Sequence, residues 1–129
     1  MPVLGLSHIN IRAPRALLDE LKDFYVDVVG LSLGFRPPFQ RFGYWLYAGD
    51  SHVCHLTEAD PSENQAHHVL TTFDHIALTC VDRATHEAAL TQHGVPFKVA
   101  IVPHTQQVQL FFDDPAGNGV ELVFADGKQ

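Results

Sequence analysis

The two halves of this 129-residue chain carry the same pattern of short apolar segments and potential metal ligands. His8 in LSHINIR lies 67 positions before His75 in FDHIALT, and His55 in VCHLTE lies 66 positions before Glu121 in GVELVF. Two halves that stay in step within one residue indicate a duplicated structural unit. The duplication constrains the fold more than any other feature, because both halves must form the same arrangement of strands and helices.

In the first half the pattern predicts one strand, one helix and three more strands. A strand is expected over residues 4–12, followed by a helix in which apolar side chains recur every three or four positions from Leu17 to Val28. Pro14 suits the first turn of this helix, and Gly30 suits its end. The remaining strands are expected at 31–36, 42–48 and 52–58.

The second half repeats this order after a polar linker, expected over residues 59–72. Its helix is expected over residues 83–93, and its strands at 73–81, 97–102, 107–112 and 119–124. The sequence therefore predicts an α+β fold made of two tandem βαβββ modules, about 1–58 and about 73–129. Each module is too small to bury much of a core, so we expect residues 1–129 to form a single domain.

Strand alternation places the candidate ligands on polar faces, because side chains two apart share a face. His8 shares its face with Asn10 and Arg12, whereas Asp74 is expected to face away from His75. A carboxylate enclosed beside apolar neighbours, as in GVELVF, needs a partner. We therefore expect four side chains to converge on one buried metal site: His8, His55, His75 and Glu121.

The other polar residues have plainer expected roles. A histidine is more often a surface or hydrogen-bonded core residue than a ligand, which is the role expected for His52, His67, His68, His86, His93 and His104. Arg36 and Arg41 could hold an anionic substrate group, although a solvated charge is the simpler expectation. Trp45 and Tyr47 share a face that could line a pocket or belong to the core. Hydrogen bonds around the ligands could come from Asn10, Arg12, Gln107 and Gln109.

Charge and composition exclude several classes of protein. A net charge of −7 with only eight Lys and Arg argues against a nucleic-acid surface. No apolar run approaches the roughly 18 residues that suggest a membrane span, and no targeting segment begins the chain, so we expect a cytoplasmic protein. Cys54 and Cys80 lie on the strand faces opposite His55 and His75, where free, buried thiols are expected rather than a disulfide.

Five segments covering nearly the whole chain carry a resemblance: SHINIRA, FYVDVVGLSLGFR, YWLYAGDSHVCHLTE, FDHIALTCVD and FFDDPAGNGVELV. They resemble the vicinal oxygen chelate superfamily, which includes glyoxalase I, extradiol dioxygenases, fosfomycin-resistance thiol transferases and bleomycin-resistance proteins. The resemblance implies curled mixed sheets around a metal-binding trough, and a homodimer with sites shared between subunits. It places His8, His75 and Glu121 on the usual metal positions, and His55 where glyoxalase I has a glutamate.

The role of His55 leaves two chemistries open. Two imidazoles and one carboxylate leave a divalent metal open positions for substrate oxygens. With His55 as a fourth ligand, the set suits Zn, Ni, Co, Mn or Fe. Without it, the set resembles the triad of non-haem iron oxygenases, and His55, with an ordinary pKa of about 6.5, becomes an acid or base.

The expected function is that of a metal-dependent enzyme acting on a small molecule with adjacent oxygens. We expect glyoxalase I-like lyase or isomerase chemistry in which Glu121 moves a proton, with His55 as the other catalytic candidate. Two alternatives remain at this point. One is an extradiol-type Fe(II) dioxygenase, and the other is a non-catalytic, drug-binding protein like the bleomycin-resistance proteins.

Overall fold

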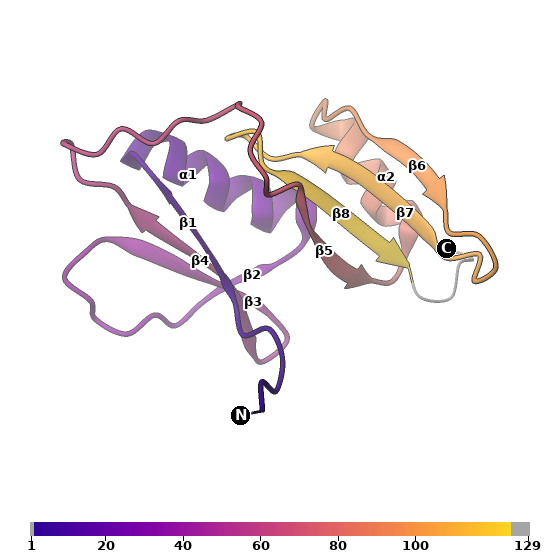
Figure 1. Cartoon of the computed structure of the whole chain (residues 1–129), viewed down its shortest axis with the longest axis horizontal. Coiled ribbons are helices and arrows are strands. Elements are labelled where there is room, and N and C mark those ends of the chain that lie inside the picture. Colours follow the sequence, from indigo (N-terminus) through magenta and orange to yellow (C-terminus); the bar gives the residue numbers. More distant parts are fainter. Residues whose placement is uncertain (1, 125–129) are drawn as a thin grey trace. The chain divides into compact units, whose positions relative to one another are not determined.

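The computed structural model describes residues 2–124, which divide into two compact units with the boundary after Gln65. This boundary falls inside the segment expected as a linker. Each unit contains one four-stranded sheet and one α-helix (Figure 1). Among the described residues, the helices are all too short and too polar to cross a membrane.

The first unit forms a mixed sheet with strand order β1-β4-β3-β2. β1 pairs in parallel with β4, and the other neighbours are antiparallel. Helix α1 packs against β1, β3 and β4, burying the apolar stripe that the sequence predicts. The elements are β1 (Ile9–Ala13), α1 (Arg15–Phe24), a π-helical turn (Tyr25–Val29), β2 (Ser32–Gly34), β3 (Gly43–Ala48) and β4 (Ser51–Glu58).

The helical region of the first unit ends as the sequence predicts. Gly30 adopts a left-handed conformation with φ of 101°, and the N–H groups of Gly30 and Leu31 both donate to the carbonyl of Tyr25. A residue with a Cβ atom is strained at such a φ, whereas glycine is not. The expected helix is therefore present, although its last turn widens from α to π geometry.

The second unit repeats the topology of the first, with strand order β5-β8-β7-β6 and β5 parallel to β8. Its fully buried side chains come from α2, β7 and β8, and include Leu90, Leu110 and Phe124. The prediction of an α+β fold with two βαβββ modules is confirmed. The elements are β5 (His75–Cys80), α2 (Arg83–Gln92), β6 (Lys98–Ile101), β7 (Val108–Asp113) and β8 (Gly119–Phe124).

The largest difference from the expected elements concerns the first strand, which begins at Ile9 rather than at residue 4. Pairing with β4 starts at Ile9 opposite Cys54, and the described residues before Ile9 belong to no strand. His8 therefore lies just before β1 and is exposed within its unit, so the expectation that it is buried is not met there.

Gly119, the first residue of β8, packs so closely that a larger side chain there should destabilise the fold. A Cβ atom on Gly119 would collide with the carbonyl oxygen of Asp74 and lie 3.0 Å from the Cβ of His75. We expect Gly119→Ala to lower the free energy of unfolding by about 3 kcal/mol, because the backbone must move. Urea denaturation measures this. Gly49→Ala is the matched control, since its φ of 60° strains alanine but nothing lies within 4 Å, and it should cost only about 1 kcal/mol. Equal losses for the two variants would contradict the prediction.

Candidate metal centre

A β-bulge in the first unit decides which histidines lie together. Leu46 pairs with Cys54, but Tyr47 pairs with His52, so β4 has one more residue than β3 at this point. In a regular strand His52 and His55, three positions apart, face opposite sides. The extra residue shifts the alternation of side chains along β4, so that both imidazoles lie on the same face of the sheet.

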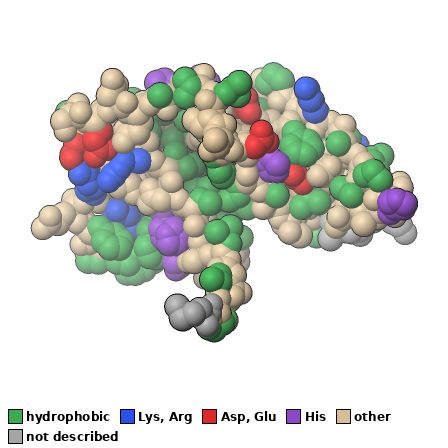
Figure 2. Space-filling view, in the orientation of Figure 1, with side chains coloured by type: hydrophobic (Ala, Val, Ile, Leu, Met, Phe, Trp, Pro, Cys, Tyr) green, Lys and Arg blue, Asp and Glu red, His purple; other side chains and the backbone are tan. Residues whose placement is uncertain are grey.

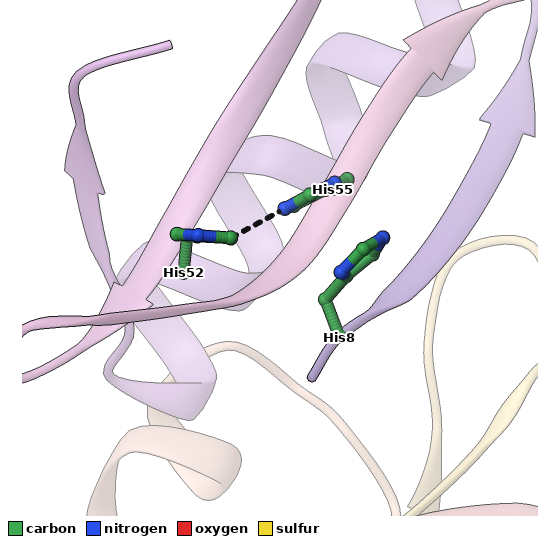
Figure 3. A group of neighbouring side chains, drawn as sticks. All are labelled: His8, His52 and His55. Carbon is green, nitrogen blue, oxygen red and sulfur yellow. Dashed lines mark hydrogen bonds between the residues drawn. The ribbon is translucent and has the colours of Figure 1, made fainter. Parts of the chain in front are cut away.

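Three imidazoles form a cluster at this face (Figure 3). The Nδ1 of His52 lies 2.8 Å from the Nε2 of His55, and the ring of His8 stacks on the ring of His55 with centroids 3.7 Å apart. One ligand atom from each residue lies within 4.8 Å of the others. His8 and His55 are thus brought together as expected. The sequence did not predict that His52 joins this group, because alternation alone does not reveal a bulge.

Trp45 covers the cluster from the neighbouring strand. Its ring lies 4.2 Å from that of His52 and 4.1 Å from that of His55, centroid to centroid. His55 is only 6% exposed. Burial, together with the charges of His8 and His52, lowers the pKa of His55 to about 4. The His55 imidazole is therefore neutral near pH 7, as a metal ligand must be.

The low pKa of His55 predicts a loss of stability in acid. Between about pH 6.5 and pH 4 the unfolded chain binds a proton at this site and the folded chain does not, so the free energy of unfolding falls by about 3 kcal/mol as the pH drops. Urea denaturation of metal-free protein across this range, wild type against His55→Gln, isolates the effect. Ionisable groups away from His8 and His52, which interact with His55, act alike in both proteins. If the two proteins lose the same stability, the pKa of His55 is not depressed.

The second unit brings His75 and Glu121 together, as the sequence predicts. The Nε2 of His75 lies 3.0 Å from the Oε1 of Glu121, which is 6% exposed. Gln109 donates from Nε2 to the other carboxylate oxygen at 3.0 Å. The buried carboxylate therefore has the partners it requires, and one of them is a glutamine expected from the sequence.

Asp74 holds the other side of the His75 ring. The Nδ1–H of His75 donates to the Oδ2 of Asp74 at 2.7 Å, and this bond, with the charge of Glu121, raises the pKa of His75. The expectation that Asp74 faces away is wrong, because Asp74 precedes the first residue of β5 and is not bound by strand alternation. A carboxylate on Nδ1 leaves Nε2 to face a metal, which is a common arrangement around metal-binding histidines.

The donor spacings fit a divalent metal. Two ligand atoms about 2.1 Å from an ion and at right angles to each other lie about 3 Å apart. The His52–His55 and His75–Glu121 atom pairs are separated by 2.8 Å and 3.0 Å, respectively. Imidazole and carboxylate groups together suit Zn, Ni, Co, Mn or Fe. Each unit thus presents two potential ligand atoms that contact each other directly, at a distance that two neighbouring ligands of one ion also have.

The other residues singled out in the sequence form contacts outside the candidate ligand set. Asn10 donates to Thr57 at 3.1 Å, and Arg12 forms an ion pair with Glu63 at 3.3 Å. Asn10 lies opposite His55 in the sheet, but among the described residues its side chain forms no hydrogen bond to a candidate ligand. His86 is half-buried near Phe124 rather than solvated, and burial lowers its pKa. Neither Cys54 nor Cys80 forms a disulfide, and Cys54 is buried.

A family model matches residues 5–122. The chain belongs to the Glyoxalase/Bleomycin resistance protein/Dioxygenase superfamily. No curated protein sequence matches it.

Solved structures of this superfamily share the fold at low sequence identity. A lactoylglutathione lyase from Agrobacterium tumefaciens is 21% identical with a TM-score of 0.66, covering 98% of this chain and 97% of that one. The fosfomycin resistance protein FosX from Listeria monocytogenes is 17% identical with a TM-score of 0.69, covering 95% and 94%. An antibiotic-binding protein from a Streptomyces species is 20% identical with a TM-score of 0.65, covering 96% and 98%. At these identities the likeness establishes the fold, and enzymes and binding proteins share it.

Proposed function

We propose that this chain is a metal-dependent enzyme acting on a small molecule with adjacent oxygens. His8, His55, His75 and Glu121 are its proposed ligands to one divalent metal, with His52 as a further imidazole donor in the first unit. The observation that carries the proposal is the buried Glu121 carboxylate, held 3.0 Å from the Nε2 of His75. We infer one ion held by both halves from the sequence duplication, which gives each half a matching pair of potential ligands.

The protein groups around the proposed ion have separate tasks. A divalent metal bound here supplies Lewis acidity toward two neighbouring substrate oxygens. Glu121 moves the proton, because it is the buried carboxylate of the site and Gln109 fixes its orientation. Asp74 keeps His75 in the required ring orientation. His55 serves as a ligand, since a pKa of about 4 makes it a poor acid or base near neutral pH.

Lyase or isomerase chemistry of the glyoxalase I type is the reaction we favour. Glu121 as a proton-transfer group and His55 as a fourth ligand, at the position where glyoxalase I has a glutamate, both support it. A lactoylglutathione lyase among the structural neighbours is consistent with this choice. The second candidate is an Fe(II) dioxygenase, which the two imidazoles of His8 and His75 with one carboxylate favour. The proposal also includes a homodimer with shared sites, and light scattering on the purified protein tests the dimer.

Metal analysis tests the proposal directly. Protein purified without added metal should contain about one divalent ion per chain, and the EDTA-treated protein should gain thermal stability on addition of Zn, Ni, Mn or Fe(II). Absence of both stoichiometric metal and stabilisation would overturn the proposal. A ratio of two ions per chain would show that the units bind metal separately, and would reject the shared ion.

Two activity assays separate the reaction classes. Loss of a hemithioacetal, followed by ultraviolet absorbance, reports glyoxalase-type isomerisation, whereas oxygen uptake with catechols reports ring cleavage. We expect the first assay to be positive in protein loaded with Zn or Ni. Oxygen uptake by the Fe(II) form alone would instead select the dioxygenase.

A further inference from the structure

A pocket of about 620 Å³ in the first unit adjoins the three histidines. His8, His52 and His55 line one part of it, and Trp45, Phe39 and Arg36 line another. In Figure 2, histidine, Lys or Arg, and hydrophobic side chains adjoin on the part of this unit that carries β3 and β4. The pocket thus combines the imidazole cluster with aromatic surface and positive charge.

Two aromatic rings give the pocket flat walls. The Phe39 ring lies 6.1 Å from the Trp45 ring, at 43° to it. Phe39 belongs to the segment between β2 and β3 and is 54% exposed, although it is a large apolar side chain. Flat apolar rings of this kind favour a ligand with a flat, unsaturated body, because stacked rings gain contact energy beyond the area they bury.

Arg36 supplies a positive charge that no carboxylate within residues 2–124 neutralises. Among the described residues it forms no ion pair and no hydrogen bond, and its Nε is buried without a partner. Its guanidinium carbon lies 4.9 Å from the centre of the Phe39 ring. A guanidinium charge without an anionic partner favours a ligand that supplies one, bound through the Nη atoms of the planar fork.

Arg41, in contrast to Arg36, is paired with carboxylates. Arg41 lines the same pocket but forms ion pairs with Asp60 and Glu63, and it donates to the carbonyl of Glu58. Gly43 keeps room for Arg36, because a Cβ atom there would lie 2.9 Å from the Nη2 of Arg36. The backbone therefore accommodates Arg36 beside the pocket, while only Arg41 receives carboxylate partners.

We propose that this pocket binds a flat, unsaturated organic carboxylate, with its carboxylate on Arg36 and its ring against Trp45 and Phe39. This names a substrate class for the proposed enzyme, and it rests on the proposed function only in treating the pocket as part of that site. A planar guanidinium matches a carboxylate with two parallel hydrogen bonds, which gives orientation as well as affinity. The three histidines then lie in the same pocket as the bound molecule.

Trp45 is the only tryptophan of the chain, so its fluorescence reports on this pocket. In EDTA-treated protein we expect benzoate to quench it saturably. Benzyl alcohol, which is flat but neutral, should bind about tenfold to a hundredfold more weakly, because charge-assisted hydrogen bonds are lost. Cyclohexanecarboxylate, which is charged but not flat, should bind about threefold to tenfold more weakly. Equal affinity for all three compounds would overturn the proposal.

The variant Arg36→Gln tests whether Arg36 binds the carboxylate of benzoate. Benzoate should bind this variant about tenfold or more weakly, while the weak binding of benzyl alcohol should stay unchanged. Arg83→Gln removes the same charge from α2 in the second unit and should leave benzoate affinity as in the wild type. An unaltered benzoate affinity in Arg36→Gln, or an equal loss in Arg83→Gln, would reject Arg36 as the anchor.

Because the binding experiment uses metal-free protein, it tests the carboxylate pocket separately from the proposed metal site. Benzoate binding that depends on Arg36 supports the substrate class even if metal analysis finds no ion. A protein that binds stoichiometric metal but ignores benzoate refutes the substrate class alone. Circular dichroism of Arg36→Gln checks that the fold is retained, and Arg36→Lys, which keeps the charge but not the planar fork, should recover only part of the affinity.

Discussion

Replacing His55 with alanine is expected to weaken Zn or Ni binding by more than about a hundredfold, because loss of even an indirect partner of a metal ligand costs ten- to a hundredfold. His55 is buried, neutral near pH 7, and 2.8 Å from a second imidazole nitrogen on His52. It also contacts the rings of His8 and Trp45. Competition against a metal-binding dye measures the affinity.

Two further variants locate the effect. His52→Ala should weaken binding by about tenfold, since the first unit then retains His8 and His55. His104→Ala removes an exposed histidine of the second unit and should leave the affinity unchanged. If His55→Ala keeps its metal but loses its reaction rate, His55 acts as an acid or base instead. If His52→Ala costs more than His55→Ala, then His52 is the principal donor of β4.

Sequence repetition explains why the topology was predictable. Each half must bury one helix stripe against one sheet, and residues such as Leu18 and Leu21 carry the three- and four-residue spacing that shows which face is buried. Glycine and proline mark the ends of the elements through their backbone preferences. Candidate ligands separated by 67 and 66 positions lie in equivalent strands or, for His8, one residue before one, so their pairing within each unit follows from the repeat.

The missed parts of the site depend on departures from regular structure. The bulge between β3 and β4 turns His52 toward His55, and no residue type in that segment signals it. Asp74 reaches His75 because the strand begins at His75, two residues later than the sequence predicts, so alternation does not apply to Asp74. Arg36 and Arg41 look alike in sequence. They differ because Asp60 and Glu63, about 20 residues away in the chain, form ion pairs with Arg41 and not with Arg36.

Replacing Glu121 with glutamine is expected to reduce turnover by about a hundredfold or more in whichever assay the wild type performs, because the proton-transfer group is removed. The substitution keeps the volume of the side chain, and its amide can still bond to Gln109 after rotation. The fold should therefore survive, which thermal unfolding of both proteins checks. Metal affinity should fall as well, since a charged ligand becomes neutral.

A second measurement detects the change at Glu121 without any assay of activity. The charge of Glu121 contributes to the raised pKa of His75, so Glu121→Gln should lower the pKa of His75 toward its ordinary value. Nuclear magnetic resonance titration of the imidazole ring in metal-free protein measures this shift. Glu87→Gln, which removes a carboxylate paired with Arg83 on α2, should leave both the His75 titration and the turnover unchanged. If Glu121→Gln lowers the pKa of His75 but keeps full activity, Glu121 contacts His75 as described, and another residue moves the proton.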